Sequence, residues 1–239
     1  MNEPQNIRIR EIIPINIEGG FLVDGFPSIG FTSAIATESL IHTSQFKLGG
    51  VIDSDSFPPV SIIKDGTPNY PTRIFVNEDL KVAVFSSYLT LHESLHRQMA
   101  RQMLDWAKLH RCSLVVSSVA VKNSKEEKQE VAAGSTNSAK AKLKEAGFVV
   151  LQHGTIPGIP GALLNEGMLN NQDVVVILFN ANDTGPDFKA SVELCMAMAK
   201  LVPGVSCNIE SLQKDAETAE KEIKETEQEA RNLTDSMYR

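Results

Sequence analysis

The sequence has few cysteines and no long apolar run. Its three cysteines, Cys112, Cys195 and Cys207, form no CxxC pair, and their odd number favours a reducing compartment over a disulfide framework. No apolar run approaches the roughly 18 residues that a membrane-spanning helix needs. The first twelve residues, MNEPQNIRIREI, lack the uninterrupted apolar stretch of a signal peptide. These absences predict a soluble, cytoplasmic protein that has no membrane partner.

Positive charge is also scarce. The chain has 23 Lys and Arg against 30 Asp and Glu, which gives a formal net charge of −7. A chain of this charge is repelled by phosphate backbones and by anionic lipid surfaces, so nucleic acid is not an expected partner. The 239 residues, of which 42% are hydrophobic, can bury a substantial core.

Motifs for catalysis are missing or weak. The chain contains no Gly-Lys-Ser/Thr phosphate loop and no Gly-x-Ser-x-Gly nucleophile turn. The segment HESLH matches H-E-x-x-H, in which His92 and His96 would bind zinc and Glu93 would act as the base. However, the cation of Arg97 follows directly, and His92 falls within the apolar stripe of a predicted helix. We therefore expect no metal, no cofactor and no enzymatic activity.

Short apolar runs alternate with helical patterns along residues 8–205. The runs LVVSSVAV and DVVVILFNA are continuous, as is typical of strands covered on both faces. A long helix is predicted from Thr90, its expected N-cap, to His110, with apolar residues on one stripe. This alternation predicts an α/β protein, a three-layer sandwich with a mostly parallel sheet. Residues 56–72, rich in Pro, Gly and Asp, interrupt the rhythm as a hairpin or excursion.

Two loops rich in Gly and Pro each have two interpretations. They are GFPSIGF at 25–31 and HGTIPGIPGALLNEG at 153–167. A loop that opens a helix can bind an anion at the helix N-terminus. Alternatively, the glycines allow positive φ angles and close packing in a tight connection between a strand and a helix. We favour the structural interpretation for the second loop, while the first stays open.

The composition changes after Gly204. From residue 209 onward, small or apolar residues recur at alternating spacings of three and four, which indicates a heptad seam. The larger members of the seam are Ile209, Leu212, Ile223 and Leu233. The pattern predicts two parts, an α/β domain over residues 1–205 and a charged amphipathic helical arm over residues 206–239. The arm either lies on its own domain or projects and pairs with other subunits.

Three motifs in order carry a family resemblance. They are Gly25 to Gly30, Gly154 to Leu164 and Asp187 to Lys200. With them, the chain resembles the archaeal proteasome assembly chaperone family, of the PbaB type, over about residues 8–205. The resemblance implies an α/β sandwich similar to nucleoside phosphorylases without their catalytic residues. It also implies a homo-oligomer, for which we expect a tetramer or a similar ring.

The last three residues also match a motif. Met237, Tyr238 and Arg239 resemble the HbYX tail of proteasome activators and of PbaB-type chaperones, which docks between neighbouring α subunits of the core proteasome. Met237 would supply a flexible apolar plug and Tyr238 a ring with a hydroxyl group. The α-carboxylate of Arg239 would pair with a lysine.

Together these features predict an ATP-independent proteasome assembly chaperone or activator, whose partner is the α ring of the core particle. Two alternatives stay open. One is an enzyme that uses the phosphorylase-like fold, such as a nucleosidase. The other is an orphan oligomer whose tail only stabilises the assembly.

Overall fold

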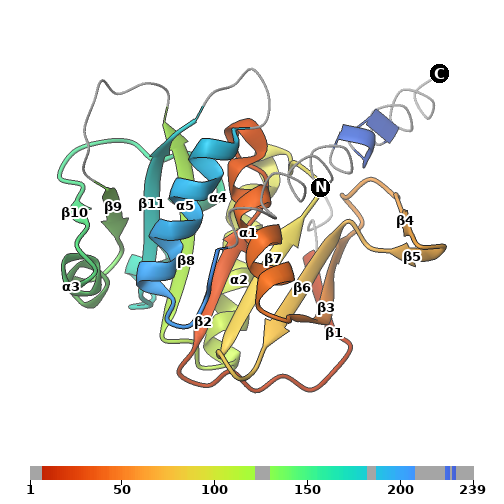
Figure 1. Cartoon of the computed structure of the whole chain (residues 1–239), viewed down its shortest axis with the longest axis horizontal. Coiled ribbons are helices and arrows are strands. Elements are labelled where there is room, and N and C mark those ends of the chain that lie inside the picture. Colours follow the sequence, from red (N-terminus) through yellow and green to blue (C-terminus); the bar gives the residue numbers. More distant parts are fainter. Residues whose placement is uncertain (1–6, 122–129, 182–186, 208–223, 227, 230–239) are drawn as a thin grey trace, which may run out of the picture.

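The fold is given by a computed structural model of the chain. The structure describes residues 7–121, 130–181, 187–207, 224–226 and 228–229. A nine-stranded sheet forms its centre, in the order β1-β3-β6-β7-β2-β8-β11-β9-β10 (Figure 1). In chain order the strands are β1 (Ile7–Glu11), β2 (Phe21–Gly25), β3 (Lys47–Ser54), β6 (Thr72–Asn77), β7 (Val82–Ser87), β8 (Leu114–Val121), β9 (Val131–Gly134), β10 (Val149–Val150) and β11 (Val174–Asn180). The helices are η1 (Ile29–Phe31), α1 (Thr32–Thr43), α2 (Glu93–Leu109), α3 (Asn137–Glu145), α4 (Gly158–Leu169) and α5 (Phe188–Leu201).

The sheet is mixed. Its centre, β7-β2-β8-β11, is parallel. On one side β6, β3 and β1 extend it through antiparallel pairings, and on the other side β9 is antiparallel to β11. The α/β class is confirmed, but the parallel arrangement is limited to the centre and to the short β9–β10 pair. Each central parallel strand requires a helical crossover, whereas β6 and β7 are joined by a short turn.

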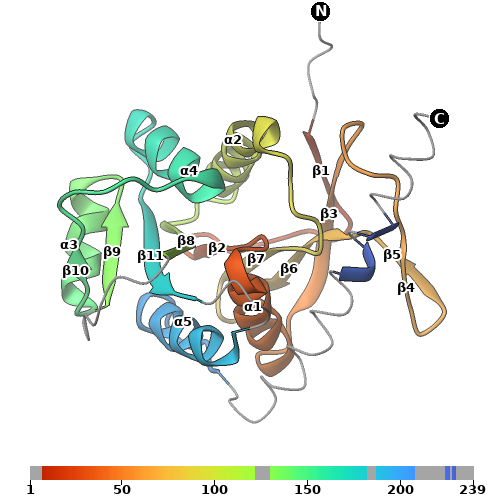
Figure 2. The same cartoon turned by 90° about the horizontal axis from the view of Figure 1, so that it is seen from above.

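Helices cover both faces of the sheet, so the predicted three-layer sandwich is confirmed. Helices α2 and α4 pack together on one face, and α1 and α5 pack together on the other (Figure 2). Two apolar clusters fill the two spaces between sheet and helices. Strand β8 is buried along residues 114–118 because both faces are covered, as its continuous apolar run predicts.

A small hairpin leaves the body between β3 and β6, within the segment predicted as an excursion. Its strands are β4 (Ile62–Lys64) and β5 (Thr67–Asn69), which pair antiparallel and extend outward in Figure 1. The turn residues Asp65 and Gly66 have φ angles of 50° and 73°. Positive φ at both central residues is the condition for a tight type I′ hairpin, which Asp-Gly satisfies.

A disulfide joins the middle of helix α5 to the chain beyond its end, which corrects the expectation from the number of cysteines. Cys195 on α5 is bonded to Cys207, with 6.0 Å between their Cα atoms. The chain reverses at Pro203 and Gly204, where Gly204 has a φ angle of 83°. This reversal brings Cys207 back alongside α5, which the spacing in the sequence does not reveal.

Among the described helices, none combines the length and the apolar character that crossing a membrane requires.

Candidate functional site

Residues at the carboxyl ends of β7 and β2 lie next to a pair of serines within β8, and all of them except Gly25 are polar. They are residues 86–87 of β7, 24–25 of β2 and 117–118 of β8. In each pair one residue faces α2 and the other faces α1, because side chains alternate along a strand. In open α/β sheets, ligands usually bind at the carboxyl ends of the parallel strands. The binding site lies where the connections from two neighbouring strands run to opposite sides of the sheet. We call these residues and their partners the carboxyl-edge cluster.

Asp24 is the buried acid on the α2 side of the cluster. Its side chain is 4% exposed and accepts hydrogen bonds from Ser117 Oγ at 2.7 Å and from the Phe26 amide at 3.1 Å. Burial raises the pKa of Asp24 to about 6, although both hydrogen bonds and nearby His96 act in the opposite direction. Asp24 therefore holds the start of the 26–31 loop through the Phe26 amide, although burial makes its ionised form unfavourable.

Serine hydroxyls join α1 to the sheet on the other side. Ser33 Oγ lies 2.8 Å from Ser118 Oγ and 2.8 Å from Ser28 Oγ, and the Ser33 amide donates to Ser28 Oγ at 3.1 Å. The helix approaches β2 closely here, because a Cβ atom on Gly25 would lie 2.5 Å from Thr37 Oγ1. The first Gly/Pro loop therefore needs Gly25 for close packing, which decides the interpretation that the sequence left open.

Glu38 is a second buried acid, on α1. It accepts hydrogen bonds from Ser86 Oγ and Tyr88 Oη, both at 3.1 Å, and its carboxylate lies 3.7 Å from Arg73 Nη2 and 3.5 Å from His42 Nε2. Burial alone would raise the pKa of Glu38. The hydrogen bond from His42 and the charge of Arg73 outweigh burial and hold this pKa below its ordinary value.

Arg73 completes this part of the cluster. The guanidinium group lies between two aromatic rings, 5.0 Å from the centroid of Phe75 and 4.7 Å from that of Tyr88. Its Nε and Nη2 atoms are buried and make no hydrogen bond to any described residue. Arg73 is thus held by charge and by ring stacking, and it balances the buried charge of Glu38.

The cluster contains serines and carboxylates, which are common in catalytic sites, but they are not arranged as in a serine hydrolase. Within the described ranges, no serine of the cluster hydrogen-bonds to a histidine, which is the contact that activates a serine nucleophile. Its hydroxyls and carboxylates bond to one another and join β2, β7, β8 and α1. The arrangement supports a role in holding the first Gly/Pro loop and α1 on the sheet.

The second Gly/Pro loop is a tight connection into α4, as predicted. Gly158 has a φ angle of 75°, and a Cβ atom on Gly161 would lie 2.0 Å from the carbonyl oxygen of Ile156. The loop borders a hollow of about 260 Å³, whose lining includes Leu151, His153 and Asn165. Both glycines are therefore required by the backbone itself.

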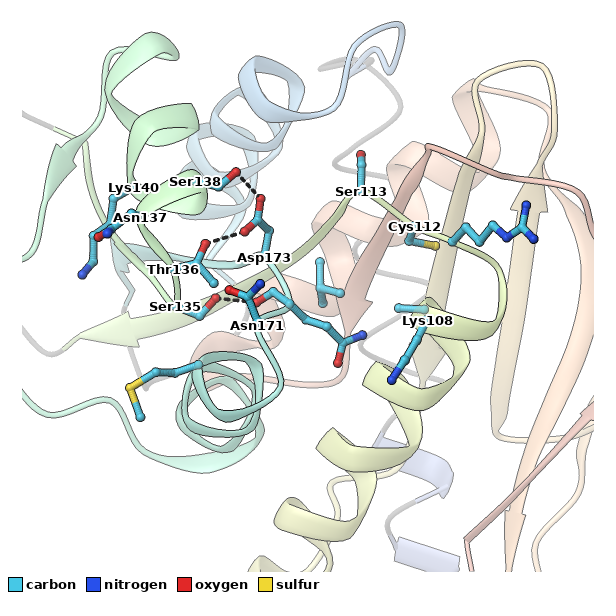
Figure 3. A pocket seen from close by; sticks show the side chains of 15 residues that line it. Lys108, Cys112, Ser113, Ser135, Thr136, Asn137, Ser138, Lys140, Asn171 and Asp173 are labelled. Carbon is cyan, nitrogen blue, oxygen red and sulfur yellow. Dashed lines mark hydrogen bonds between the residues drawn. The ribbon is translucent and has the colours of Figure 1, made fainter.

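A wider hollow of about 800 Å³ lies at the opposite edge of the sheet, between the ends of α2 and α4 and the start of α3 (Figure 3). Asp173 forms part of its wall and accepts hydrogen bonds from Thr136, from Ser138 at 2.6 Å and from Lys142 at 2.7 Å. Burial would raise the pKa of Asp173, but these donors, Lys142 first, hold it below its usual value. The carboxylate is thus occupied in attaching α3 to β11.

Cys112 also lines this hollow. Burial raises the pKa of its thiol to about 12, so the thiolate that a nucleophile requires is not formed near neutral pH.

The H-E-x-x-H residues lie at the start of α2, and the expected position of His92 was wrong. His92 is exposed and is itself the N-cap in place of Thr90, with Nδ1 accepting from the Ser94 amide at 3.2 Å. His96 Nε2 lies 3.0 Å from the Leu91 carbonyl oxygen. The apolar stripe is formed by Leu95, Met99, Met103 and Trp106, all buried. Within the described part of the chain, no three His, Cys, Asp or Glu residues are grouped to hold a metal ion.

The predicted docking and seam residues lie outside the described residues. They are Met237, Tyr238 and Arg239 of the tail and Ile209, Leu212, Ile223 and Leu233 of the seam. The described residues nearest to them, 224–226 and 228–229, are helical. Thr226, which the 3-4 spacing places on the seam, is 4% exposed, whereas Lys224, Glu225, Gln228 and Glu229 are exposed. One face of this short segment is therefore buried.

Comparison with protein families decides the family. The model of the PAC2 family matches residues 22–227. The chain belongs to the PAC2 family. A protein of Methanocaldococcus jannaschii, MJ0106, is 24% identical over 221 residues, which cover 92% of this chain and 90% of that protein.

Solved structures show that the fold is shared. PbaA of Pyrococcus furiosus, described as an archaeal homolog of proteasome-assembly chaperone, is 22% identical, with a TM-score of 0.79 and coverage of 96% of this chain and 100% of that one. PbaB of the same organism, described as an archaeal proteasome activator, is 18% identical, with a TM-score of 0.70 and coverage of 93% and 99%. The resemblance drawn from the three sequence motifs is confirmed.

The carboxyl-edge cluster was not found from the sequence. Asp24, Glu38 and Arg73 lie far apart along the chain, and only the sheet order brings β6, β7 and β2 together. A signal was present in the polar residues that end the apolar runs FLVDG and VAVFSS and that interrupt the run LVVSSVAV. Polar residues at the ends of several parallel strands converge, because these strands end at one edge.

Proposed function

We propose that this PAC2 family protein is a non-enzymatic, ATP-independent proteasome assembly chaperone or activator. The observation that carries the proposal is the combination of a PAC2 family body with the sequence Met237-Tyr238-Arg239. Two proteins that share this fold are described as a homolog of proteasome-assembly chaperone and as a proteasome activator. The proposed partner is the α ring of a core proteasome in the cytoplasm.

The tail supplies three kinds of contact. Met237 fills an irregular apolar gap, Tyr238 buries a ring and keeps a hydrogen-bonding hydroxyl, and the α-carboxylate of Arg239 pairs with a cation. The proposal requires Arg239 to carry the free α-carboxylate. The intact mass of the mature protein tests this requirement.

Several tails act together in this proposal. The body over residues 1–205 forms a homo-oligomer, a tetramer or a similar ring, and each subunit presents one arm over residues 206–239. A single three-residue tail binds weakly, whereas linked tails gain from their high effective concentration once the first has docked. The same arrangement accommodates assembly of the α ring and opening of its gate.

An enzyme built on this fold would need a nucleophile or a base poised next to a substrate site. In the carboxyl-edge cluster the serines bond to Asp24, to Glu38 and to one another, and this supports a structural role.

The experiment that tests the function is a pull-down of purified core proteasome and of isolated α subunits. Native protein should retain them, and protein that lacks residues 237–239 should not. If neither core particle nor α subunits are retained by the native protein, the proposed function is wrong.

A further inference from the structure

A disulfide cross-links the chain just beyond α5 to the body. Cys195 is fully buried on α5, and Cys207, partly buried, packs against the apolar cluster under α1 and α5. The disulfide closes a short loop that contains the end of the helix and the Pro203-Gly204 reversal. Cys207 is thus held at the point where the predicted arm begins.

Little else holds residues 203–207. Val202 is fully buried, and its amide donates to the Met198 carbonyl at 2.9 Å, so it still belongs to the helix end. Beyond it, none of residues 203–207 donates or accepts a backbone hydrogen bond with another described residue. Their noncovalent contacts come from the 8% exposed side chain of Val205, from Gly204 near Leu80 and from the partly buried side chain of Cys207 against the same apolar cluster. One buried valine and one partly buried cysteine offset only part of the conformational entropy that five ordered residues lose.

We propose that the Cys195–Cys207 disulfide is a redox-operated anchor, which fixes residues 203–207 on α5 and releases them when it is reduced. In the oxidised protein the arm leaves the body from Cys207. In the reduced protein it leaves from Val202, and the five freed residues lengthen its tether by on the order of 16 Å when extended.

The chemistry of the step is thiol–disulfide exchange with a dithiol. A thiolate of the dithiol attacks Cys207, the more accessible sulfur, and the Cys195 sulfur leaves with the bonding electron pair and takes up a proton. The second thiol of the reagent then displaces Cys207, so the dithiol is oxidised to a disulfide while both cysteines become thiols. Cys195 remains buried as a small apolar side chain, and α5 keeps its packing.

The functional consequence rests on the proposed role of the arm as carrier of the docking tail. The described helical residues 224–226 and 228–229 lie on the side of the molecule that carries the β4–β5 hairpin, across from α5 in both views (Figures 1 and 2). There the side chain of Thr226 is buried. The described start of the arm at Cys207 and its described residues 224–226 and 228–229 therefore lie on different sides of the molecule, and the five residues freed on reduction lengthen the connection between them.

The anchor is tested on the full chain in a Cys112→Ser background, which leaves only the two paired cysteines. Aerobically purified protein should contain no titratable thiol before a dithiol is added and two afterwards. Selective labelling of valine methyl groups then compares Val205 with Val202. On reduction the order parameter of Val205 should fall while that of Val202 stays high.

Limited digestion with proteinase K provides a second readout. Cleavage between residues 203 and 208 should accelerate about tenfold or more on reduction. The variant Cys207→Ser should be cleaved at the rapid rate with or without dithiol. No proteasome is present in either assay, so failure of the anchor is distinguishable from failure of tail docking. Two free thiols in the aerobic protein, or an unchanged Val205 order parameter and cleavage rate after reduction, would overturn the proposal.

Discussion

Replacing Asp24 with Asn should make the protein more stable at high pH. Asp24 is 4% exposed, and its carboxylate has two hydrogen-bond donors in place of full hydration. Asn keeps the oxygen that accepts from the Phe26 amide. The Ser117 hydroxyl can turn to accept from the new amide group, so the variant removes the charge and preserves the contacts.

The pH window follows from the direction of the shift. The pKa of Asp24 rises from 3.8 to about 6 on folding. The stabilising effect of the protonated form is therefore fully present below pH 3.8 and is lost as pH rises through 6. A shift of about two units corresponds to roughly 3 kcal/mol of unfolding free energy. Asp24→Asn and the native protein should be about equally stable near pH 4, and the variant should be more stable by up to about 3 kcal/mol at pH 8.

Urea denaturation at a fixed protein concentration, repeated from pH 4 to pH 8, measures this difference. Groups that titrate independently of Asp24 contribute equally to the unfolding free energy of variant and native protein, so their contributions cancel in the difference. His96 does not cancel fully, because its charge acts on Asp24. The same comparison in a His96→Gln background isolates that coupling. A stability difference that stays constant across this range would refute the assignment of a buried, titrating carboxylate.

Two further substitutions test the packing of the body and the placement of the arm. Gly25→Ala places a methyl group 2.5 Å from Thr37 Oγ1 and 3.0 Å from the Phe85 carbonyl oxygen, so it should cost about 1–3 kcal/mol and lower the Tm; an unchanged Tm in differential scanning calorimetry would show that α1 does not press on β2. Ile223→Asp puts a charge on the predicted seam and should increase proteolysis within residues 206–239 while the Tm of the body is preserved; loss of cooperative unfolding of the whole chain would show that the arm is part of the core.

The sequence predicted the features that depend on local periodicity. Strand β8 and the long helix α2 could be located because a continuous apolar run and a 3-4 apolar stripe each indicate one type of element. The hairpin could be located because residues 56–72 are rich in Pro, Gly and Asp, which favour turns. The three Gly/Pro and acidic motifs identified the family, and two of their glycines proved to be close-packing positions.

Features that depend on long-range pairing could not be predicted. The antiparallel pairings of β1, β3 and β6 extend the sheet beyond its parallel centre, and the order of elements along the chain does not determine on which side they add. The cluster of Asp24, Glu38 and Arg73 follows from that order. The Cys195–Cys207 bond depends on the chain reversal at Pro203 and Gly204, and an odd number of cysteines gives no indication of it.

The proposed function depends most directly on the docking of the tail. Surface titration of the oligomer over an immobilised α ring should be compared between the native protein and a protein with three glycines added after Arg239. The extension keeps every native side chain but moves the carboxylate, and the loss is repeated at each tail, so binding should fall below detection at concentrations where the native protein saturates. Tyr238→Ala, which removes an aromatic anchor worth on the order of 2 kcal/mol, should behave in the same way. If the extended protein binds the ring as tightly as the native protein does, the tail does not carry the interaction.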